Sequence, residues 1–125
     1  MTDYIIGIGS NINAQSNIKK AIEALKRHGE INAVSDFVIT KPIGITDQDD
    51  FHNGALWLST QLSASELNDC LKSIEDELGR DRSRPKFGPR EIDLDIVVNN
   101  NKVVDDDYHT RSFLREAVDQ IWKKK

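Results

Sequence analysis

The sequence has little of what disulfide-bonded, membrane-spanning or basic nucleic-acid-binding proteins need. It contains one cysteine, so no intrachain disulfide can form and no zinc cluster is indicated. No apolar run approaches the ~20 residues of a membrane span, and no signal-peptide pattern opens the chain. Lys and Arg number 17 against 21 Asp and Glu, for a net charge of −4. We therefore expect a cytoplasmic protein with no general affinity for nucleic acid or membrane.

What the chain does have suits one compact unit. Its 125 residues, 38% of them hydrophobic, are typical of a single domain, which we place at residues 1–125. No internal repeat or linker interrupts it. Cys70 falls within a helical pattern, and we expect it to be a small buried thiol.

Apolar periodicity predicts strands and helices in alternation. The predicted strands are residues 4–10, the end of 31–40, 51–60 and the stretch at 87–98. One predicted helix contains the apolar positions 18, 21, 22 and 25 and stops near Gly29; the next begins at a capping box, Ser63 to Glu66, and closes at Gly79. A turn at 99–101, a short edge strand at 103–104 and a last helix at 113–121 complete the tail.

This order, β-α-β-β-α-β, is typical of an α+β ferredoxin-like sandwich with an antiparallel sheet, here followed by a C-terminal helix. The two main helices are expected to cover one face of the sheet. The other face is then left free for a ligand.

The stretch FGPREIDLDIVV at residues 87–98 sets two carboxylates in an apolar strand. Because side chains alternate along a strand, Asp93 and Asp95 share one face. The opposite, core-facing set is Ile92, Leu94, Ile96 and Val98. Like charges so close are unfavourable unless a cation joins them, and Mg²⁺ prefers one or two carboxylates plus phosphate oxygens. Two ordinary aspartates on a solvated strand would give the same pattern.

The segment directly before these acids favours the metal interpretation. It carries five cations in eleven residues, namely Arg80, Arg82, Arg84, Lys86 and Arg90. Arginines bind phosphates through paired donors and stabilise charge during phosphoryl transfer. Carboxylates for a metal beside arginines for phosphate form the combination that phosphoryl transfer uses.

Other polar residues have weaker patterns. The run at 7–11, GIGSN, lacks a complete phosphate-loop motif, and we interpret it as a strand exit whose polar end supports the site. Phe51 and Asn53 share a strand parity, so they can stack a flat heterocycle and bind its edge, with residues 40–44 lining the same pocket. For Phe51, packing in the core is the alternative to stacking a ligand. Among the histidines, His109, beside Arg111, is a candidate phosphate ligand.

Together these pieces resemble the 6-hydroxymethyl-7,8-dihydropterin pyrophosphokinase family of folate biosynthesis. The resemblance covers roughly residues 4–98 in order. It is carried by GSN at 9–11, TKPIG at 40–44, FHN at 51–53, Glu75 through Gly79-Arg80, and FGPREIDLDI at 87–96. The last motif is highly specific.

The resemblance implies transfer of pyrophosphate from ATP to the pterin hydroxymethyl group, releasing AMP, with two Mg²⁺ ions. Its implied catalytic residues are Arg80, Arg90, Asp93 and Asp95, the two aspartates holding the metal. Its implied ATP-binding residues are Lys72, Glu75, Arg82, Arg90, Ile96, His109 and Arg111. Its implied pterin-binding residues are Thr40, Pro42, Ile43, Phe51, Asn53 and Phe113.

The sequence departs from the family after the acid strand. Family members usually have a longer stretch there, with a Pro-His pair whose histidine touches ATP; here residues 105–113 are compressed and only His109 can stand in. Two other hypotheses therefore remain open. One is a catalytically weak pterin- or nucleotide-binding module, and the other is a ferredoxin-like interaction domain without ligand.

Overall fold

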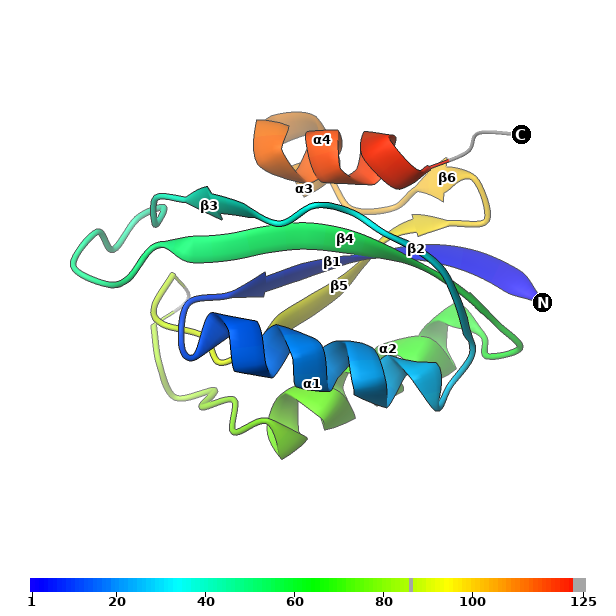
Figure 1. Ribbon diagram of the computed structural model, residues 1–125, viewed down its shortest axis with the longest axis horizontal. Coiled ribbons are helices and arrows are strands. Elements are labelled where there is room, and N and C mark those ends of the chain that lie inside the picture. The colour runs from blue at the N-terminus through cyan, green and yellow to red at the C-terminus, as the bar shows by residue number, and fades with distance from the viewer. Residues whose placement is uncertain (86, 123–125) are drawn as a thin grey trace.

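An antiparallel sheet lies between two layers of helices in the computed structural model, which describes residues 1–85 and 87–122 (Figure 1). Within that range the strands are β1 (Thr2–Ser10), β2 (Glu30–Val34), β3 (Val38–Thr40), β4 (Phe51–Thr60), β5 (Asp93–Asn99) and β6 (Lys102–Val103). The helices are α1 (Ala14–Lys26), α2 (Ala64–Glu77), α3 (Asp107–Thr110) and α4 (Ser112–Ile121).

The sheet order is β2-β4-β1-β5-β6, with β3 also paired to β4. The predicted ferredoxin-like α+β fold is confirmed, since α1 and α2 connect its strands and lie together on one face. The strand predicted to end the 31–40 segment is confirmed as β3, but the separate strand β2 before it was not predicted. Ser35 causes the break: its amide donates to the Ala55 oxygen and its hydroxyl accepts from the Ala55 amide, both at 2.8 Å.

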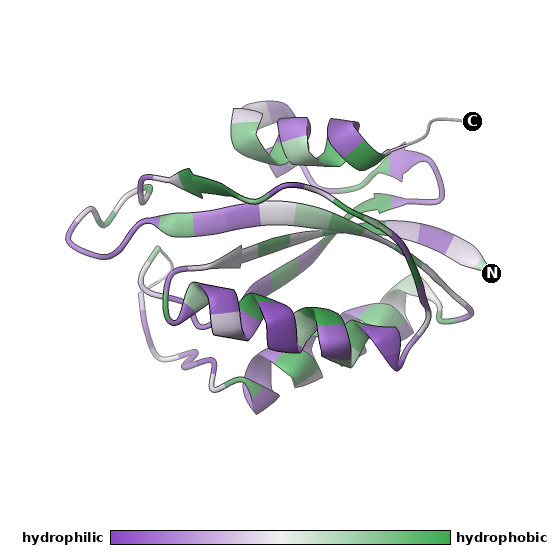
Figure 2. Cartoon of the chain, in the orientation of Figure 1, coloured by the Kyte–Doolittle hydropathy of each residue, from purple (hydrophilic) through white to green (hydrophobic). Residues whose placement is uncertain are grey.

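The face under α1 and α2 carries the larger core. Alternate residues of β1 (Tyr4, Ile6 and Ile8) point into it beside Leu67 and Leu71 of α2. Figure 2 shows the matching arrangement, in which both helices turn hydrophobic residues toward the sheet and hydrophilic ones outward. The capping box at Ser63 and Glu66 is present, and Gly79, at φ +92°, ends the α2 segment as predicted.

The opposite face is not wholly free, which corrects the prediction. Helix α4 packs over its far half through Ala117, Val118 and Ile121, against Ile5 and Ala55 of the sheet. The sequence indicated this helix without indicating where it docks. A pocket lies at the end of this face where α4 begins, between the segments 40–43 and 87–90.

Strand alternation in β5 changes near its end. Ile6 pairs with Ile96 and Ile5 with Val98, so Val97 is an extra, bulged residue. Ile92 and Leu94 face the α1 and α2 core as predicted, but Val98 joins the α4 side instead. A bulge shifts the side-chain parity beyond it, and nothing in the sequence pattern predicts where it falls.

Helix α1 ends at Lys26, so its predicted stop near Gly29 holds. Gly29 is not a left-handed cap, because its φ is not positive; a Cβ there would lie 2.4 Å from the Ser59 oxygen, so close approach explains the glycine. The prediction of a buried thiol is wrong. Cys70 is half-buried, with its sulfur 3.9 Å from His28 Nδ1. Among the described residues, no helix combines the length and apolar character needed to cross a bilayer.

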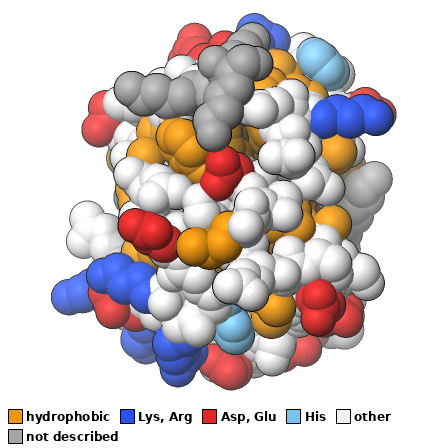
Figure 3. All heavy atoms as spheres, turned by 90° about the vertical axis from the view of Figure 1, so that its right-hand side faces the viewer, with side chains coloured by type: hydrophobic (Ala, Val, Ile, Leu, Met, Phe, Trp, Pro, Cys, Tyr) orange, Lys and Arg blue, Asp and Glu red, His pale blue; other side chains and the backbone are white. Residues whose placement is uncertain are grey.

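Figure 3 views the end of the molecule away from the long loops. Acidic and basic side chains are interspersed there around a small apolar area, and no broad basic surface is seen among the coloured residues.

Candidate active site

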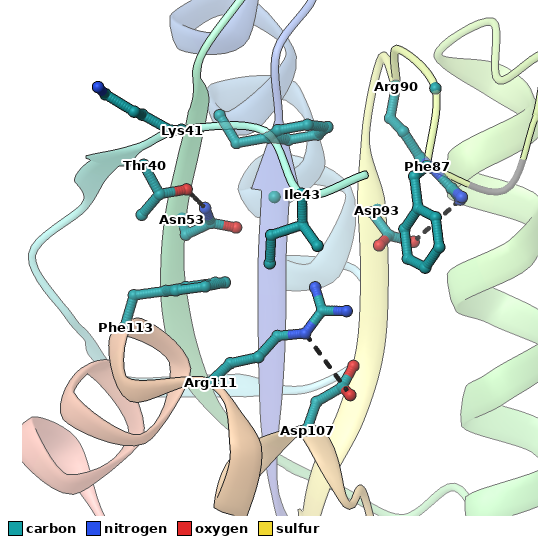
Figure 4. Close-up of a pocket in the computed structure, with 13 residues that line it drawn as sticks. Thr40, Lys41, Ile43, Asn53, Phe87, Arg90, Asp93, Asp107, Arg111 and Phe113 are labelled. Carbon is teal, nitrogen blue, oxygen red and sulfur yellow. Dashed lines mark hydrogen bonds and ion pairs between the residues drawn. The ribbon is translucent and has the colours of Figure 1, made fainter. Parts of the chain in front are cut away.

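A pocket of about 200 Å³ opens at the uncovered end of the sheet (Figure 4). Strands β1, β4 and β5 form its floor, the segments 40–43 and 87–90 form its sides, and α3 and α4 close it from above. Its lining residues are Gly9, Thr40, Lys41, Ile43, Phe51, Asn53, Phe87, Gly88, Arg90, Asp93, Asp107, Arg111 and Phe113.

Strand register brings the two halves of this pocket together. Gly9 of β1 pairs with Asn53 of β4 on one side and with Asp93 of β5 on the other. A Cβ at Gly9 would lie 2.9 Å from the Asn53 side-chain oxygen, so only glycine leaves room for that amide. Gly9 of the central strand β1 therefore lies between Asn53, which carries the amide, and Asp93, which carries the carboxylate.

On the Asn53 side of the pocket, aromatic residues form part of the lining and the amide is held in one orientation. Asn53 Nδ2 donates a 2.6 Å hydrogen bond to Thr40 Oγ1, which fixes the amide plane. Phe51 precedes it on β4, Phe113 is the second residue of α4, and both line the pocket. An oriented amide between aromatic rings suits a flat heterocycle with hydrogen-bonding edges.

The carboxylate side combines acids with arginines. Arg80 lies 3.4 Å from Asp93 Oδ1 and 3.3 Å from Glu75 Oε2, and only 13% of its side chain is exposed. Arg90 approaches the same Asp93 oxygen at 3.8 Å. Two guanidinium groups therefore converge on one carboxylate, and an anionic ligand can compete for both.

Asp95 lies one pleat further along the same face. It lines an adjoining hollow of about 70 Å³ together with Asp93, Asp105, Asp107 and Arg111. The predicted sharing of one strand face by Asp93 and Asp95 thus holds before the bulge at Val97. Arg111 pairs with Asp107 at 3.7 Å on the α3 side of both hollows.

These acids are held in an unfavourable electrostatic environment. Loss of hydration inside the concave face raises the pKa of Asp95 to about 7, and the charges of Asp93 and Glu75 add to the shift. Burial also raises the pKa of Asp93 and outweighs the attraction of Arg80. Because a nearby positive charge stabilises ionised carboxylates, binding of a cation between these acids would be favourable.

Glu75 lies behind the arginines rather than on the pocket surface. Its side chain is 5% exposed; one oxygen accepts from the Leu94 amide at 2.8 Å and the other from Arg82 at 3.1 Å. Burial raises its pKa, while Leu94 and the two arginines oppose that shift. Glu75 therefore positions Arg80 and Arg82, and its buried location disfavours direct contact with a nucleotide.

The remaining predicted site residues lie outside the pocket lining. Arg82 turns toward α2, pairing with Asp76 at 3.0 Å and donating to the Lys72 carbonyl. His109 is exposed and packs edge-on against Tyr108. Pro42 and Ile96 are half-buried beside the site without lining it. Lys86, one of the five cations, lies outside the described residues.

Sequence reasoning missed several residues of the site. Asp107 and Gly88 line the pocket but were not predicted to do so, because they belong to segments without periodicity; Lys41 lies in the 40–44 segment that was expected to line it. Gly9 was recognised as part of a motif, while its place between Asn53 and Asp93 depends on strand register. The predicted supporting role of the strand exit is confirmed by Asn11, whose Oδ1 accepts from the Arg90 amide at 2.8 Å.

Comparison with known proteins agrees with this geometry. The family model for 7,8-dihydro-6-hydroxymethylpterin-pyrophosphokinase (HPPK) matches residues 5–123. A 2-amino-4-hydroxy-6-hydroxymethyldihydropteridine pyrophosphokinase of Aquifex aeolicus is 39% identical over 105 residues, covering 83% of this chain and 65% of that protein. The protein of the same name from Haemophilus influenzae is 34% identical over 125 residues, covering 91% of this chain and 78% of its own length.

Larger proteins contain the same unit. A folate synthesis bifunctional protein of Arabidopsis thaliana is 36% identical over 107 residues, covering 83% of this chain and 22% of that protein. This chain thus spans about two thirds of the Aquifex relative and under a quarter of the Arabidopsis one. With a family model matching nearly its whole length, the chain belongs to the 7,8-dihydro-6-hydroxymethylpterin-pyrophosphokinase family.

Proposed function

We propose that this chain transfers the β,γ-pyrophosphoryl group of ATP to 6-hydroxymethyl-7,8-dihydropterin, giving AMP and the pterin diphosphate. One observation carries the proposal: Gly9 separates Asn53 from Asp93, so a heterocycle subsite and a phosphate subsite meet in one pocket. Two relatives bear the name of this pyrophosphokinase.

On the heterocycle side, each group has a simple task. Phe51 and Phe113 hold the pterin ring between their faces. The Asn53 amide, fixed by Thr40, reads the edge of the ring. Backbone near Ile43 closes the outer side, so the hydroxymethyl group is directed across Gly9 toward the acids.

On the phosphate side, the arginines align and neutralise the triphosphate. Arg80 and Arg90 already lie at the Asp93 carboxylate, and Arg111 faces them from the α3 side. In-line displacement at phosphorus needs alignment and charge stabilisation more than a strong base. Phe87 and the surrounding loop lower the access of water, which otherwise competes as nucleophile.

The residues present fit Mg²⁺. Two carboxylates share a strand face, and their raised pKa values reflect a site short of positive charge. No cluster of three acidic, histidine or cysteine ligands occurs in residues 1–85 and 87–122, but Mg²⁺ needs only one or two carboxylates when phosphates and water complete its shell. Asp93 and Asp95 would hold it, two ions per ATP, and it would neutralise phosphate oxygens.

A second candidate function has one observation in its favour. The acids of the 105–107 segment lie near the phosphate side, where His109 is not part of the lining. Extra negative charge beside a triphosphate weakens its binding. A pterin-binding module with little catalysis therefore remains the alternative to the enzyme.

The test is AMP formation from Mg-ATP with and without hydroxymethyldihydropterin. We expect AMP and pterin diphosphate in equal amounts, only when pterin and Mg²⁺ are both present. Binding of pterin with no product would support the module instead. ADP formation, or AMP formation independent of pterin, would contradict the proposed reaction.

A further inference from the structure

Arg111 is the joint between helices α3 and α4. Its backbone, with φ −118° and ψ 106°, is extended between the two helices. Its amide donates to the Asp107 carbonyl at 2.9 Å, and its carbonyl accepts from the Leu114 and Arg115 amides, both at 3.1 Å. The backbone of this pocket residue is therefore held by both helices.

Asp107 also holds the side chain of Arg111. Its Oδ1 lies 3.7 Å from Arg111 Nε, and Figure 4 shows the two side chains facing one another at the pocket, which both of them line. Because the Asp107 carbonyl already accepts from the Arg111 amide, one residue of α3 contacts Arg111 at both ends. The direction in which the guanidinium enters the pocket therefore depends on the orientation of α3.

Helix α3 cannot maintain this orientation by itself. It has four residues, Asp107–Thr110, and so short a helix gains little stability from its own hydrogen bonds. Among these four residues Tyr108 is the buried one, with 7% of its surface exposed. Its ring belongs to the apolar cluster of α4 and lies edge-on to Trp122, with the ring centroids 6.2 Å apart. Tyr108 is therefore the main attachment of α3 to the rest of the fold.

The hydroxyl of Tyr108 adds a directional contact to this packing. It donates a 2.5 Å hydrogen bond to Oδ1 of Asp119, an exposed residue of α4. This hydrogen bond and burial both raise the pKa of Tyr108, so the phenol keeps its proton and remains a donor at neutral pH. Helix α4 is itself packed on the sheet through Val118 and Ile121. The hydrogen bond therefore ties the short helix to a firmly held one.

We propose that Tyr108 is a positioning residue for Arg111: its hydrogen bond to Asp119 sets the orientation of α3, and Asp107 transmits that orientation to the guanidinium. Tyr108 does not line the pocket and touches no reacting atom. The inference rests on the proposed function, since it assigns Arg111 to the triphosphate. Phe113 belongs to α4, whose docking does not need the hydroxyl, so the effect should fall on the phosphate side alone.

The first test needs no ligand and no turnover. Amide hydrogen exchange at Arg111 is compared in the wild type, Tyr108→Phe and Asp119→Ala. Phenylalanine keeps the buried ring and loses only the hydroxyl. Exchange at the Arg111 amide should quicken about fivefold in both variants, the change expected when one hydrogen bond of ordinary strength is lost. Exchange at Val118, within α4, should stay unchanged.

The matched control is Tyr4→Phe. Tyr4 is the other of the two tyrosines; it lies in the core under α1 and α2, and its hydroxyl donates to the Leu62 carbonyl at 2.9 Å. The control thus also removes the hydrogen bond of a buried tyrosine, so it should lower stability while exchange at Arg111 keeps the wild-type rate. Exchange at Arg111 that is unchanged in Tyr108→Phe, or that quickens equally in Tyr4→Phe, would overturn the proposal.

The second test uses turnover to separate positioning from general structural support. Tyr108→Phe should lower kcat about fivefold and leave the KM for pterin within about twofold, because it disturbs transition-state contacts on the phosphate side. In an Arg111→Ala background the same substitution should cause no further loss, since residues that act through one contact are not additive. An unchanged kcat in Tyr108→Phe, or an equal loss in both backgrounds, would overturn the inference. Failure of the proposed function appears separately, as a wild type that makes no AMP, and the exchange test then still decides whether Tyr108 positions Arg111.

Discussion

The two faces of the sheet follow different physical rules. Under α1 and α2, side chains such as Leu67 and Leu71 are fully buried and packed on one another. At the open end of the other face, Asp93 and Asp95, two carboxylates with raised pKa values, lie near Arg80 and Arg90. The first face contributes stability, and the second gives up stability for chemistry, the usual relation between a core and an active site. Substitutions on the two faces should therefore have opposite profiles.

The largest expected effect is on turnover at the acid pair. Asp93→Asn and Asp95→Asn should each lower kcat by about 1,000-fold or more, because they remove charge that holds the metal against the phosphates. Circular dichroism should show an intact fold in both. Steady-state AMP production measures the loss, with the exposed α2 variant Asp69→Asn as control. Near-normal turnover in either acid variant would remove that residue from the metal site.

The next largest effect is expected on the core face, where a substitution should lower stability and leave turnover nearly unchanged. Leu71→Ala should lower the free energy of unfolding by about 2–5 kcal/mol, since it opens a cavity in close-packed surroundings. Urea denaturation measures the change, and kcat per folded molecule should stay within about twofold. A Leu71 variant of normal stability would show that the α2 face is less tightly packed than its burial indicates.

A smaller effect is expected at the aromatic side of the pocket. Phe113→Ala should weaken pterin binding by about 1 kcal/mol, roughly fivefold, because one stacking face is lost. ATP affinity should change much less. Calorimetry with each ligand separates the two effects, and an unchanged pterin affinity would exclude Phe113 from the pterin subsite.

The smallest effect links charge in the site to stability. The folded pKa of Asp95, about 7, exceeds the unfolded value, so its penalty is absent at low pH and grows as pH rises from about 4 to 7. Asp95→Asn should therefore be more stable than the wild type at pH 8, by about 1 kcal/mol after allowance for solvent screening. The difference should vanish near pH 4. Thermal unfolding across that range measures it, and a variant less stable at pH 8 contradicts the electrostatic account.

If Asp95 helps to hold the metal, it should also determine how much Mg²⁺ stabilises the folded protein. Mg²⁺ should raise the Tm of the wild type at pH 8, because binding to the folded state alone is stabilising. It should raise the Tm of Asp95→Asn much less. Equal shifts in both proteins would mean that the ion binds elsewhere.

Local sequence patterns predicted much of this molecule, whereas the features that depend on contacts between distant segments were not predicted. Side-chain periodicity and the capping box at Ser63 indicated the elements and the shared face of Asp93 and Asp95. The bulge at Val97 and the docking of α4 depend on packing between distant segments. The hydrogen bond from Gln48 to the Phe87 carbonyl crosses 39 positions of sequence, and no period or motif marks it.

The most direct measurement of the central claim follows labelled phosphorus through one reaction. ATP labelled at the β position and, separately, at the γ position is incubated with Mg²⁺, hydroxymethyldihydropterin and the protein. The account predicts that both labels appear in the pterin product, with unlabelled AMP released, because Asn53 and Asp93 bring the hydroxymethyl group to the β-phosphorus. Transfer of the γ label alone, or release of either label to water without a labelled pterin, would contradict it.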